Sequence, residues 1–321
     1  MPEMPTLSER YQGCLLGLML GDCLGFAFEG WSAEDIAAEC PTAAALLQRP
    51  PLPPPWPYTD DTEMAIGVAE ALLNDGEIRA GTLAAAWVRN YTRGRPYGAT
   101  RMVLEAMLAG QDYQAAAQAL FPGGSYGNGA AMRVAPVGLF FHRDLDLVWR
   151  QAGLSAIPTH PHPLAVEGAQ ILALAVALAV ASPVAAGPFD RDAFFDQLQR
   201  RCRTPEFRAK LATARGLDDV AALSVLGNGV RALESVVTAA ACFACSPDDC
   251  VAAVTKAIFL GGDTDTIGAM TGAIAGARCG VRAIPRYLLD SLEDSVRGRT
   301  YVSRLAVQLA AVPSSSIPPH L

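Results

Sequence analysis

Apolar residues recur at helical spacing along most of the chain, and this pattern predicts a protein built from α-helices. Six alanine-rich segments place apolar residues three and four positions apart, as on one face of an α-helix. We find no convincing alternation of apolar and polar residues, so strands should be minor or absent. We therefore expect the all-α class, with more than ten helices packed together. The six segments are Ser8–Leu20, Asp61–Leu73, Thr82–Tyr91, Pro163–Ala181, Gly229–Ala244 and Thr266–Ala277.

Three other segments complete the outline of the fold. The proline-rich segment Arg49–Pro57 cannot be helical inside, because proline lacks an N–H group and its ring clashes with the preceding turn. Arg191–Arg201 is more polar and is predicted to form a surface helix. Pro313–Leu321 is rich in proline and serine and is expected to be a flexible tail. Without a linker or an internal repeat, we predict one domain over residues 1–321, with a core at about residues 8–312.

Composition and charge limit the classes of function. The chain has 321 residues, of which 51% are hydrophobic and 18% are charged, as in a folded protein with a large core. Its net charge of -7 argues against broad nucleic-acid binding, which needs a basic surface. The longest apolar run, Ile171 to Ala181, is too short to span a bilayer and predicts a buried helix. With no secretory-signal pattern at its start, we expect a cytoplasmic monomer that contacts no membrane.

The chain contains eight cysteines, most of them inside apolar helical patterns. Such cysteines are expected to be free buried thiols in a reducing cytosol. Cys242 and Cys245 have the CxxC spacing of metal and redox sites, but only Cys250 is near enough in sequence to add a ligand. A packing role is therefore favoured, with a metal or redox role as the alternative.

Two acidic motifs each stand directly before a predicted helix. They are Thr59-Asp60-Asp61-Thr62 and, after two glycines, Asp263-Thr264-Asp265-Thr266. Helix capping, which contributes about 0.5–2 kcal/mol, would explain one such motif. Two motifs favour a shared site, because a cap needs only one carboxylate and an extended loop would aim both Asp263 and Asp265 the same way. Oxygen ligands without histidine or cysteine suit Mg²⁺ or Mn²⁺, with Ca²⁺ as an alternative, and their number suits two ions.

The segment Gly21–Gly30 carries two further acids. Its glycines and apolar residues predict a tightly packed helix end followed by a turn. Asp22 is expected to be structural and to accept hydrogen bonds from local backbone N–H groups. Glu29, considered alone, fits a solvated loop carboxylate as well as a site residue.

Three glycine-rich loops could contact a ligand. Phe121–Gly129 offers many backbone N–H groups for a phosphate and two aromatic rings for a base. Arg95–Gly98 and Leu226–Gly229 are shorter loops of the same kind. Ordinary turns use the same residues, so each loop alone is a weak indication.

Taken together, these segments resemble the ADP-ribosylglycohydrolase family, also called ADP-ribosyl-acceptor hydrolases. The resemblance runs from about Tyr11 to Gly280, with the motifs in family order: GDCLGFAFEG, YTDDTEM, SYGNGAAMRVAP, THPHP, LGNGVRALESV and LGGDTDTIGAMTGAIAG. SYGNGAAMR and the phenylalanine before it are most similar to the branch that acts on serine-linked ADP-ribose and poly-ADP-ribose. The resemblance implies a compact helical domain with a dimetal centre in a central cleft. It also implies hydrolysis at the C1″ carbon of ADP-ribose, in modified proteins or peptides and in O-acetyl-ADP-ribose.

The resemblance further implies roles for individual residues. Glu29 would be the acid that gates the site and assists cleavage, while Phe121 and Tyr126 would flank the adenine. His160 would line the pocket, although a histidine at such a position can equally be a packed core residue. Two Mg²⁺ ions, or Mn²⁺ as a substitute, would be held by Thr59, Asp60, Asp61, Asp263, Asp265 and Thr266. The substrate would contact Tyr97, Gly98, Phe121, Gly124, Ser125, Tyr126, Gly127, Asn128, Gly129, His160, Asn228 and Gly229.

Two positions depart from the family pattern. Pro96 stands where the resemblance would place a glycine in an Arg-Gly-Tyr-Gly loop, and His160–Pro163 is more constrained by its prolines. These departures bear on the choice of substrate more than on the chemistry. Two alternatives remain: an arginine-ADP-ribose hydrolase of the same family, and a catalytically silent relative with a binding or structural role. The intact acidic set argues against the silent relative, because a binding module would not need Glu29.

Overall fold

The computed structural model describes residues 4–48 and 52–313, and its regular structure there is helical. The described residues form eighteen α-helices and four short 3₁₀ helices, with two isolated β-bridges and no β-strand. The helices pack as one domain around a shared apolar core, which confirms the all-α prediction. Residues 52–57 are irregular, as expected for the proline-rich segment. The predicted flexible tail lies outside the described residues, except for Pro313.

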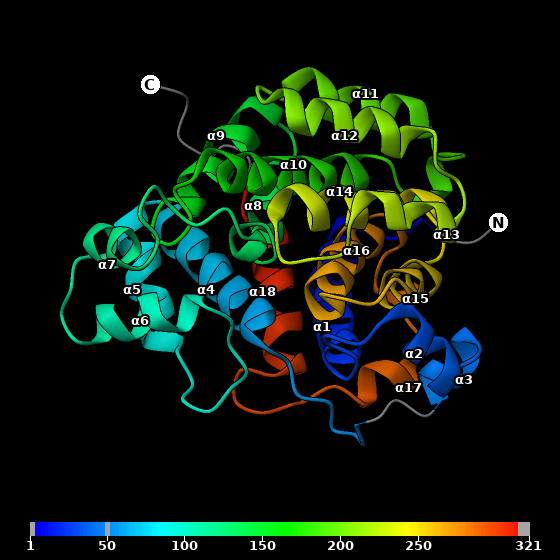
Figure 1. Cartoon of the computed structure of the whole chain (residues 1–321), viewed down its shortest axis with the longest axis horizontal. Helices are drawn as coiled ribbons and strands as arrows, with labels where there is room; N and C mark the ends of the chain where they lie inside the picture. The colour runs from blue at the N-terminus through cyan, green and yellow to red at the C-terminus, as the bar shows by residue number, and fades with distance from the viewer. Residues whose placement is uncertain (1–3, 49–51, 314–321) are drawn as a thin grey trace.

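The bounds of the helices follow the chain order shown in Figure 1. The first seven are α1 (Leu7–Phe26), α2 (Ala33–Glu39), α3 (Ala43–Gln48), α4 (Asp60–Asp75), α5 (Ala80–Asn90), α6 (Thr100–Leu108) and α7 (Tyr113–Leu120). After the 3₁₀ helix η1 (Asn128–Ala130) come α8 (Ala135–Phe140), α9 (Leu145–Ala156), α10 (Pro163–Ala181), α11 (Arg191–Arg201), α12 (Pro205–Arg215) and α13 (Val220–Leu223). The last five are α14 (Ala232–Cys245), α15 (Cys250–Phe259), α16 (Thr264–Cys279), α17 (Arg286–Asp290) and α18 (Arg299–Ala311).

The predicted helices all form, and their ends differ from the predictions at two places that matter for the site. Helix α1 continues past Leu20 to Phe26, so Asp22 lies inside it. Helix α14 begins at Ala232, and the predicted start at Gly229 was wrong. The residues before Ala232 pair instead with Phe121–Gly129, called the glycine loop below. Asn128 N donates to Val230 O at 2.9 Å and Ala232 N donates to Tyr126 O at 3.1 Å. This pairing joins two loops that are about a hundred residues apart in sequence.

Helices α1 and α16 form an antiparallel pair at the centre of the molecule (Figure 1). Glycines spaced four residues apart line both contact faces, so the two backbones touch. A Cβ atom at Gly21 would stand 2.6 Å from Ala269 N and closer still to the Gly268 carbonyl, which no side chain could occupy. The glycines that meet across the pair are Gly13 with Gly276, Gly17 with Gly272, and Gly21 with Gly268. Packing of this kind fixes how the two helices are aligned along each other, and it brings the end of α1 to the start of α16.

Helix α10 lies in the core beside this pair. Its 19 residues are apolar over most of their length, and it is the one helix of the described chain whose length and composition would suit a membrane span. Most of it is buried inside the fold, in contact with α8, α9, α14 and α16. It therefore has the environment of a core helix, as the sequence predicted.

The cysteines are part of the same packing. All eight are free thiols, and seven of them are buried, with Cys245 intermediate. Burial raises the pKa of the Cys202 thiol to about 12. Cys242 is wholly enclosed within α14 and belongs to the core. The one group of described side chains close enough to share a metal ion contains carboxylates and no cysteine. The packing role is therefore the one that the structure supports.

Candidate active site

The end of α1 and the start of α16 are tied together by backbone hydrogen bonds. Gly30 N donates to Gly262 O at 2.8 Å, and Gly262 N donates in return to Trp31 O at 2.9 Å. Thr264 Oγ1 adds a bond of 2.7 Å to Gly25 O. Gly262 has a φ of 77°, and a Cβ there would stand 2.8 Å from the Asn228 side chain, so glycine is needed for this turn. The result is that Glu29, just after α1, lies beside the first residues of α16.

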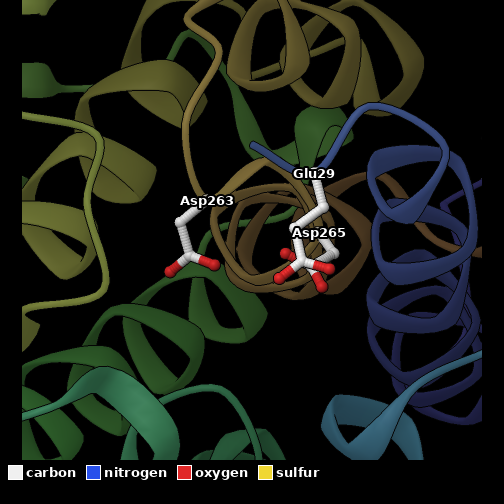
Figure 2. Close-up of side chains that lie close together, drawn as sticks. All are labelled: Glu29, Asp263 and Asp265. Carbon is white, nitrogen blue, oxygen red and sulfur yellow. The ribbon is translucent and has the colours of Figure 1, made fainter. Parts of the chain in front are cut away.

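Glu29, Asp263 and Asp265 form a tight cluster of carboxylates. One oxygen from each lies within 4.8 Å of the others, and Figure 2 shows the three side chains directed into the same space. Asp263 precedes α16 and Asp265 is in its first turn, so the expected extended loop is instead a helix start. The two acids reach the same space because they flank the first residue of that helix.

Asp22 joins α1 to the start of α4. Its carboxylate is wholly buried and accepts from Thr59 N at 3.0 Å, from Thr62 N at 3.1 Å and from Thr62 Oγ1 at 2.6 Å. Asp22 is therefore a structural residue, as predicted, but the N–H groups that it binds are not local, since they lie 37 and 40 residues further along the chain. The bonds place the first turn of α4, and with it Asp60 and Asp61, next to the α1–α16 pair.

A cavity of about 530 Å³ opens where these elements meet, a volume typical of ligand pockets. Its lining contains the carboxylates of both acidic motifs together with Glu29, so the two motifs share one site. The glycine loop forms another part of the lining. The predicted residues that line it are Glu29, Asp60, Asp61, Gly98, Phe121, Gly124, Ser125, Tyr126, Gly127, Asn128, Gly129, His160, Asp263, Asp265 and Thr266.

Burial and mutual repulsion disfavour the charged forms of these acids. Burial, and then the negative charge of Asp22, raises the pKa of Asp60 to about 7. Burial and the neighbouring carboxylates hold the pKa values of Asp61 and Asp265 well above their ordinary range. The pKa of Glu29 is raised by its partly enclosed position and by Asp263. Like charges this close are costly unless protons or cations offset them.

The same carboxylates have the properties of a cation site. Asp61 Oδ2 is buried and has no hydrogen-bond partner among the described residues. Asp263 does not cap α16; its Oδ2 accepts from Asn128 Nδ2 at 2.5 Å. Capping accounts only for Thr59, whose hydroxyl accepts from Asp61 N at 3.3 Å. Because the donors are hard oxygens with an unpartnered atom among them, the residues present fit a divalent cation.

The glycine loop follows a path that requires a glycine at position 124. Gly124 has a φ of 90°, and a Cβ there would stand 2.6 Å from His162 N. Ser125 Oγ accepts from Gly127 N at 3.2 Å and shapes the turn. Tyr126 packs edge-on against His162 with ring centroids 5.6 Å apart and keeps half of its surface exposed. Together with Phe121, it gives the cavity lining two aromatic rings.

Four of the predicted residues do not line this cavity. The Tyr97 hydroxyl donates to Glu63 Oε2 at 2.5 Å. Asn228 Nδ2 donates to Leu260 O at 2.8 Å, and the backbone carbonyl of Asn228 accepts from Asp263 N at 2.8 Å. They hold the surrounding loops in place, and direct contact with a ligand stays a prediction for them. The four residues are Thr59, Tyr97, Asn228 and Gly229.

His160 fits both of the interpretations given for it. The ring is buried, with 6% exposure, and it also lines the cavity beside Gly129. Burial and the charge of Arg133 lower its pKa to about 3, so the imidazole is neutral. The sequence analysis assigned no role to Arg133, in the SYGNGAAMR motif, or to Arg231, the arginine that lines the cavity. Arg231 could have been found only through its place in the LGNGVR motif, whose pairing with the glycine loop is a tertiary feature.

The fold and the site define a helical protein whose carboxylate cluster and glycine loop line one ligand-sized cavity. The chain belongs to the ADP-ribosylglycohydrolase family, whose sequence model matches residues 3–318. The protein is thus a hydrolase of a metal-dependent family that acts on ADP-ribosylated substrates.

Relatives agree with this assignment over nearly the whole chain. The chain is 33% identical to the human ADP-ribosylhydrolase ARH3, over 95% of this chain and 93% of that protein. It is 35% identical to ADP-ribosylhydrolase ARH3 of Gallus gallus, over 86% of this chain and 87% of that protein. Among solved structures, it is similar to an ADP-ribosylglycohydrolase-related protein complex, with a TM-score of 0.72, 29% identity, and coverage of 95% of this chain and 98% of that one.

Proposed function

We propose that the protein is a cytoplasmic, Mg²⁺-dependent hydrolase that removes ADP-ribose from modified proteins by cleaving the bond at ribose C1″. Serine-linked mono-ADP-ribose is the favoured substrate, with poly-ADP-ribose and O-acetyl-ADP-ribose as further ones. The observation that carries the proposal is the single cavity in which five carboxylates face a glycine loop. Relatives named ADP-ribosylhydrolase ARH3, about one third identical over most of their length, support the removal of ADP-ribose as the reaction.

The two walls of the cavity suit the two ends of ADP-ribose. The glycine loop offers N–H groups to the diphosphate, and Arg231 is a cationic side chain on the same wall. Phe121 and Tyr126 offer rings on which the adenine can stack. Such an orientation directs the distal ribose, and its C1″ carbon, toward the carboxylates.

The acidic wall supports the reaction at C1″. Asp60, Asp61, Asp263 and Asp265, with Thr59 and Thr266, would hold two divalent cations, which would polarise ribose oxygens and orient the sugar. In the hydrolysis, a water oxygen bonds to C1″ as the bond to the serine oxygen breaks. One proton leaves the water and one reaches the serine oxygen. Glu29, with its raised pKa and its position at the cavity, is the chain's own group for moving a proton between them.

Two alternatives give different experimental results. An arginine-ADP-ribose hydrolase would share the same cluster and differ in the leaving group that it accepts. A silent relative would bind ADP-ribose without cleaving it. Glu29 argues against the catalytically silent relative. An exposed carboxylate within 4.8 Å of Asp263 and Asp265 adds repulsion that a binding module would not need.

The test is release of ADP-ribose from peptides modified on serine or on arginine, assayed with Mg²⁺, with Mn²⁺ and with excess EDTA. The proposal expects release from the serine peptide with either metal and loss of activity in EDTA. Preferential release from the arginine peptide would favour the first alternative. Binding of ADP-ribose without release from either peptide would favour the second.

A further inference from the structure

Arg133 is a buried cation that the proposed chemistry does not use. Its side chain is fully enclosed, and it makes no ion pair with a carboxylate among the described residues. The guanidinium lies over the Trp87 ring, with Cζ 4.0 Å from the ring centroid, and Nε has no hydrogen-bond partner. Burial lowers the pKa of Arg133 to about 9, although the negative charge of Asp60 favours the charged form. A buried charge without an ion pair is costly, so its remaining contacts are informative.

Those contacts lead to the cavity. Arg133 Nη2 donates to Ser155 O at 3.3 Å and to Thr159 Oγ1 at 2.7 Å. Thr159 Oγ1 in turn lies 2.7 Å from Nδ1 of His160. All three side chains are buried. The result is a continuous line of hydrogen bonds from a buried guanidinium to a ring that lines the site.

The chemistry of the three groups determines where the protons lie. A guanidinium has donors and no acceptor, so Thr159 Oγ1 accepts from Arg133. In the described structure, the other partner of this hydroxyl is His160 Nδ1, and the threonine proton is therefore donated to that nitrogen. Nδ1 is then the acceptor of the neutral imidazole, and Nε2 carries the hydrogen.

The ring is placed so that this hydrogen faces the glycine loop. A Cβ at Gly129 would stand 2.8 Å from His160 Nε2, and one at Gly127 would stand 3.6 Å from it. His160 and both glycines line the cavity. An N–H group at Nε2 can thus reach an acceptor oxygen of a ligand that lies against this loop.

We propose that Arg133 and Thr159 are positioning residues that hold His160 as the Nε2–H tautomer, so that its ring presents one N–H donor to an oxygen of the bound ligand. The inference rests on the proposed function, because it takes ADP-ribose as the ligand, whose phosphate and ribose oxygens are acceptors. Burial and the charge of Arg133 also keep the ring neutral, so a single N–H donor is present near neutral pH.

The first test reads the tautomer directly in the full-length protein without ligand. Histidine ¹⁵N spectra distinguish a protonated from an unprotonated Nδ1, and the His160 signals are assigned by their loss in His160→Gln. The proposal expects an unprotonated Nδ1 in the wild type and in Thr159→Ser, which keeps the hydroxyl. In Thr159→Val, which has a similar shape but no hydroxyl, the spectrum should change. An Nδ1–H ring in the wild type would overturn the proposal, and so would an unchanged spectrum in Thr159→Val.

The second test measures ADP-ribose affinity by calorimetry. Thr159→Val should weaken binding about 3- to 10-fold, the effect of one net hydrogen bond, while Thr159→Ser should restore it. His160→Gln should bind better than His160→Ala, because the glutamine amide can donate from near the Nε2 position. Equal losses in Thr159→Val and Thr159→Ser would overturn the positioning role. If Thr159→Val does not fold, the wild-type and Thr159→Ser spectra still decide.

The two tests separate this inference from the proposed function. A wild type that shows the Nε2–H tautomer but does not bind ADP-ribose would contradict the proposed function, and with it the ligand named here, while leaving the tautomer established. A wild type that binds and cleaves the substrate with an Nδ1–H ring would overturn the inference alone.

Discussion

Gly21 of α1 lies directly against Gly268 of α16, and this contact sets the geometry of the site. A Cβ at Gly21 would stand 2.6 Å from Ala269 N, and its three nearest atoms would all belong to the backbone. Because α1 ends near Glu29 and α16 begins at Thr264, the contact determines how far Glu29 stands from Asp263 and Asp265.

Gly21→Ala should therefore destabilise the protein, because the backbone atoms that the new Cβ would meet cannot move aside as a side chain can. We expect the free energy of unfolding, measured in urea, to fall by about 1–3 kcal/mol or more, as for overpacking. Gly81→Ala is the matched control: Gly81 is in α5, and a Cβ there meets nothing within 4 Å. That variant should gain roughly 0.5–1 kcal/mol from helix propensity. Similar changes in both variants would contradict close helix contact.

Magnesium should stabilise the protein more at pH 8 than at pH 5.5. The pKa of Asp60 is raised from 3.8 to about 7 in the folded protein, so the folded state binds more protons than the unfolded state between these values. The stabilisation from this group is present at low pH and is lost as pH rises through about 7. At the higher pH, a divalent cation would then neutralise the charge that protons no longer neutralise. At a concentration of 100 times its Kd, it would stabilise the protein by about 2.7 kcal/mol.

Thermal unfolding with EDTA or Mg²⁺ at the two pH values checks this prediction. Asp265→Asn should reduce the effect of Mg²⁺, since the substitution removes one carboxylate whose pKa is raised. Glu39→Gln, at an exposed position on α2, serves as the control and should behave like the wild type. An equal effect of Mg²⁺ at both pH values would count against the carboxylate cluster as the cation site.

Glu29→Gln should separate catalysis from binding. A group that moves a proton at the transition state lowers kcat far more than ground-state affinity, and general acid–base assistance is worth about 10²–10⁴-fold. Single-turnover release of ADP-ribose from a serine-modified peptide measures the first, and calorimetry with free ADP-ribose measures the second. Glu34→Gln, exposed on α2, is the control. Parallel losses of binding and turnover would instead make Glu29 a residue that holds a cation.

Phe121→Ala should weaken ADP-ribose binding by roughly 1–3 kcal/mol if the adenine stacks on this ring, as alanine substitution at stacked bases does elsewhere. The binding of adenosine should weaken by a similar amount, because adenosine carries the same base. Tyr287→Ala removes an exposed aromatic ring on α17 that does not line the cavity, and it should bind like the wild type. Unchanged affinity in Phe121→Ala would place the adenine elsewhere.

Arg231→Ala should weaken the binding of ADP-ribose but not of adenosine. Arg231 lines the cavity beside Tyr126, and its guanidinium would act on the diphosphate charge. Its side chain is largely exposed, so the effect should be modest and should shrink as salt rises. Equal losses for both ligands, measured by calorimetry at two salt concentrations, would point to packing instead of charge.

The helical class, most helix positions and the acidic motifs could be predicted because their signals are local. A period of 3.6 residues shows in any helix with a buried face, and the capping position of Thr59 follows from its place before α4. The start of α14 was missed because Val230 and Arg231 pair with the glycine loop, and helical spacing carries no information about that pairing. The spacing of four between glycines in α1 and α16 is visible in the sequence, but its meaning depends on the partner helix.

By itself, then, the sequence determined the elements, the oxygen chemistry of the site and the family. Only the tertiary structure decided that Glu29 stands within 4.8 Å of Asp263 and Asp265, and that Asp22 holds α4 in place. It also decided that Tyr97 bonds to Glu63 of α4 and Asn228 to Leu260. The reason is physical. Local patterns report which side of a segment is buried, whereas distances between segments arise from packing, here from two glycine faces whose backbones meet.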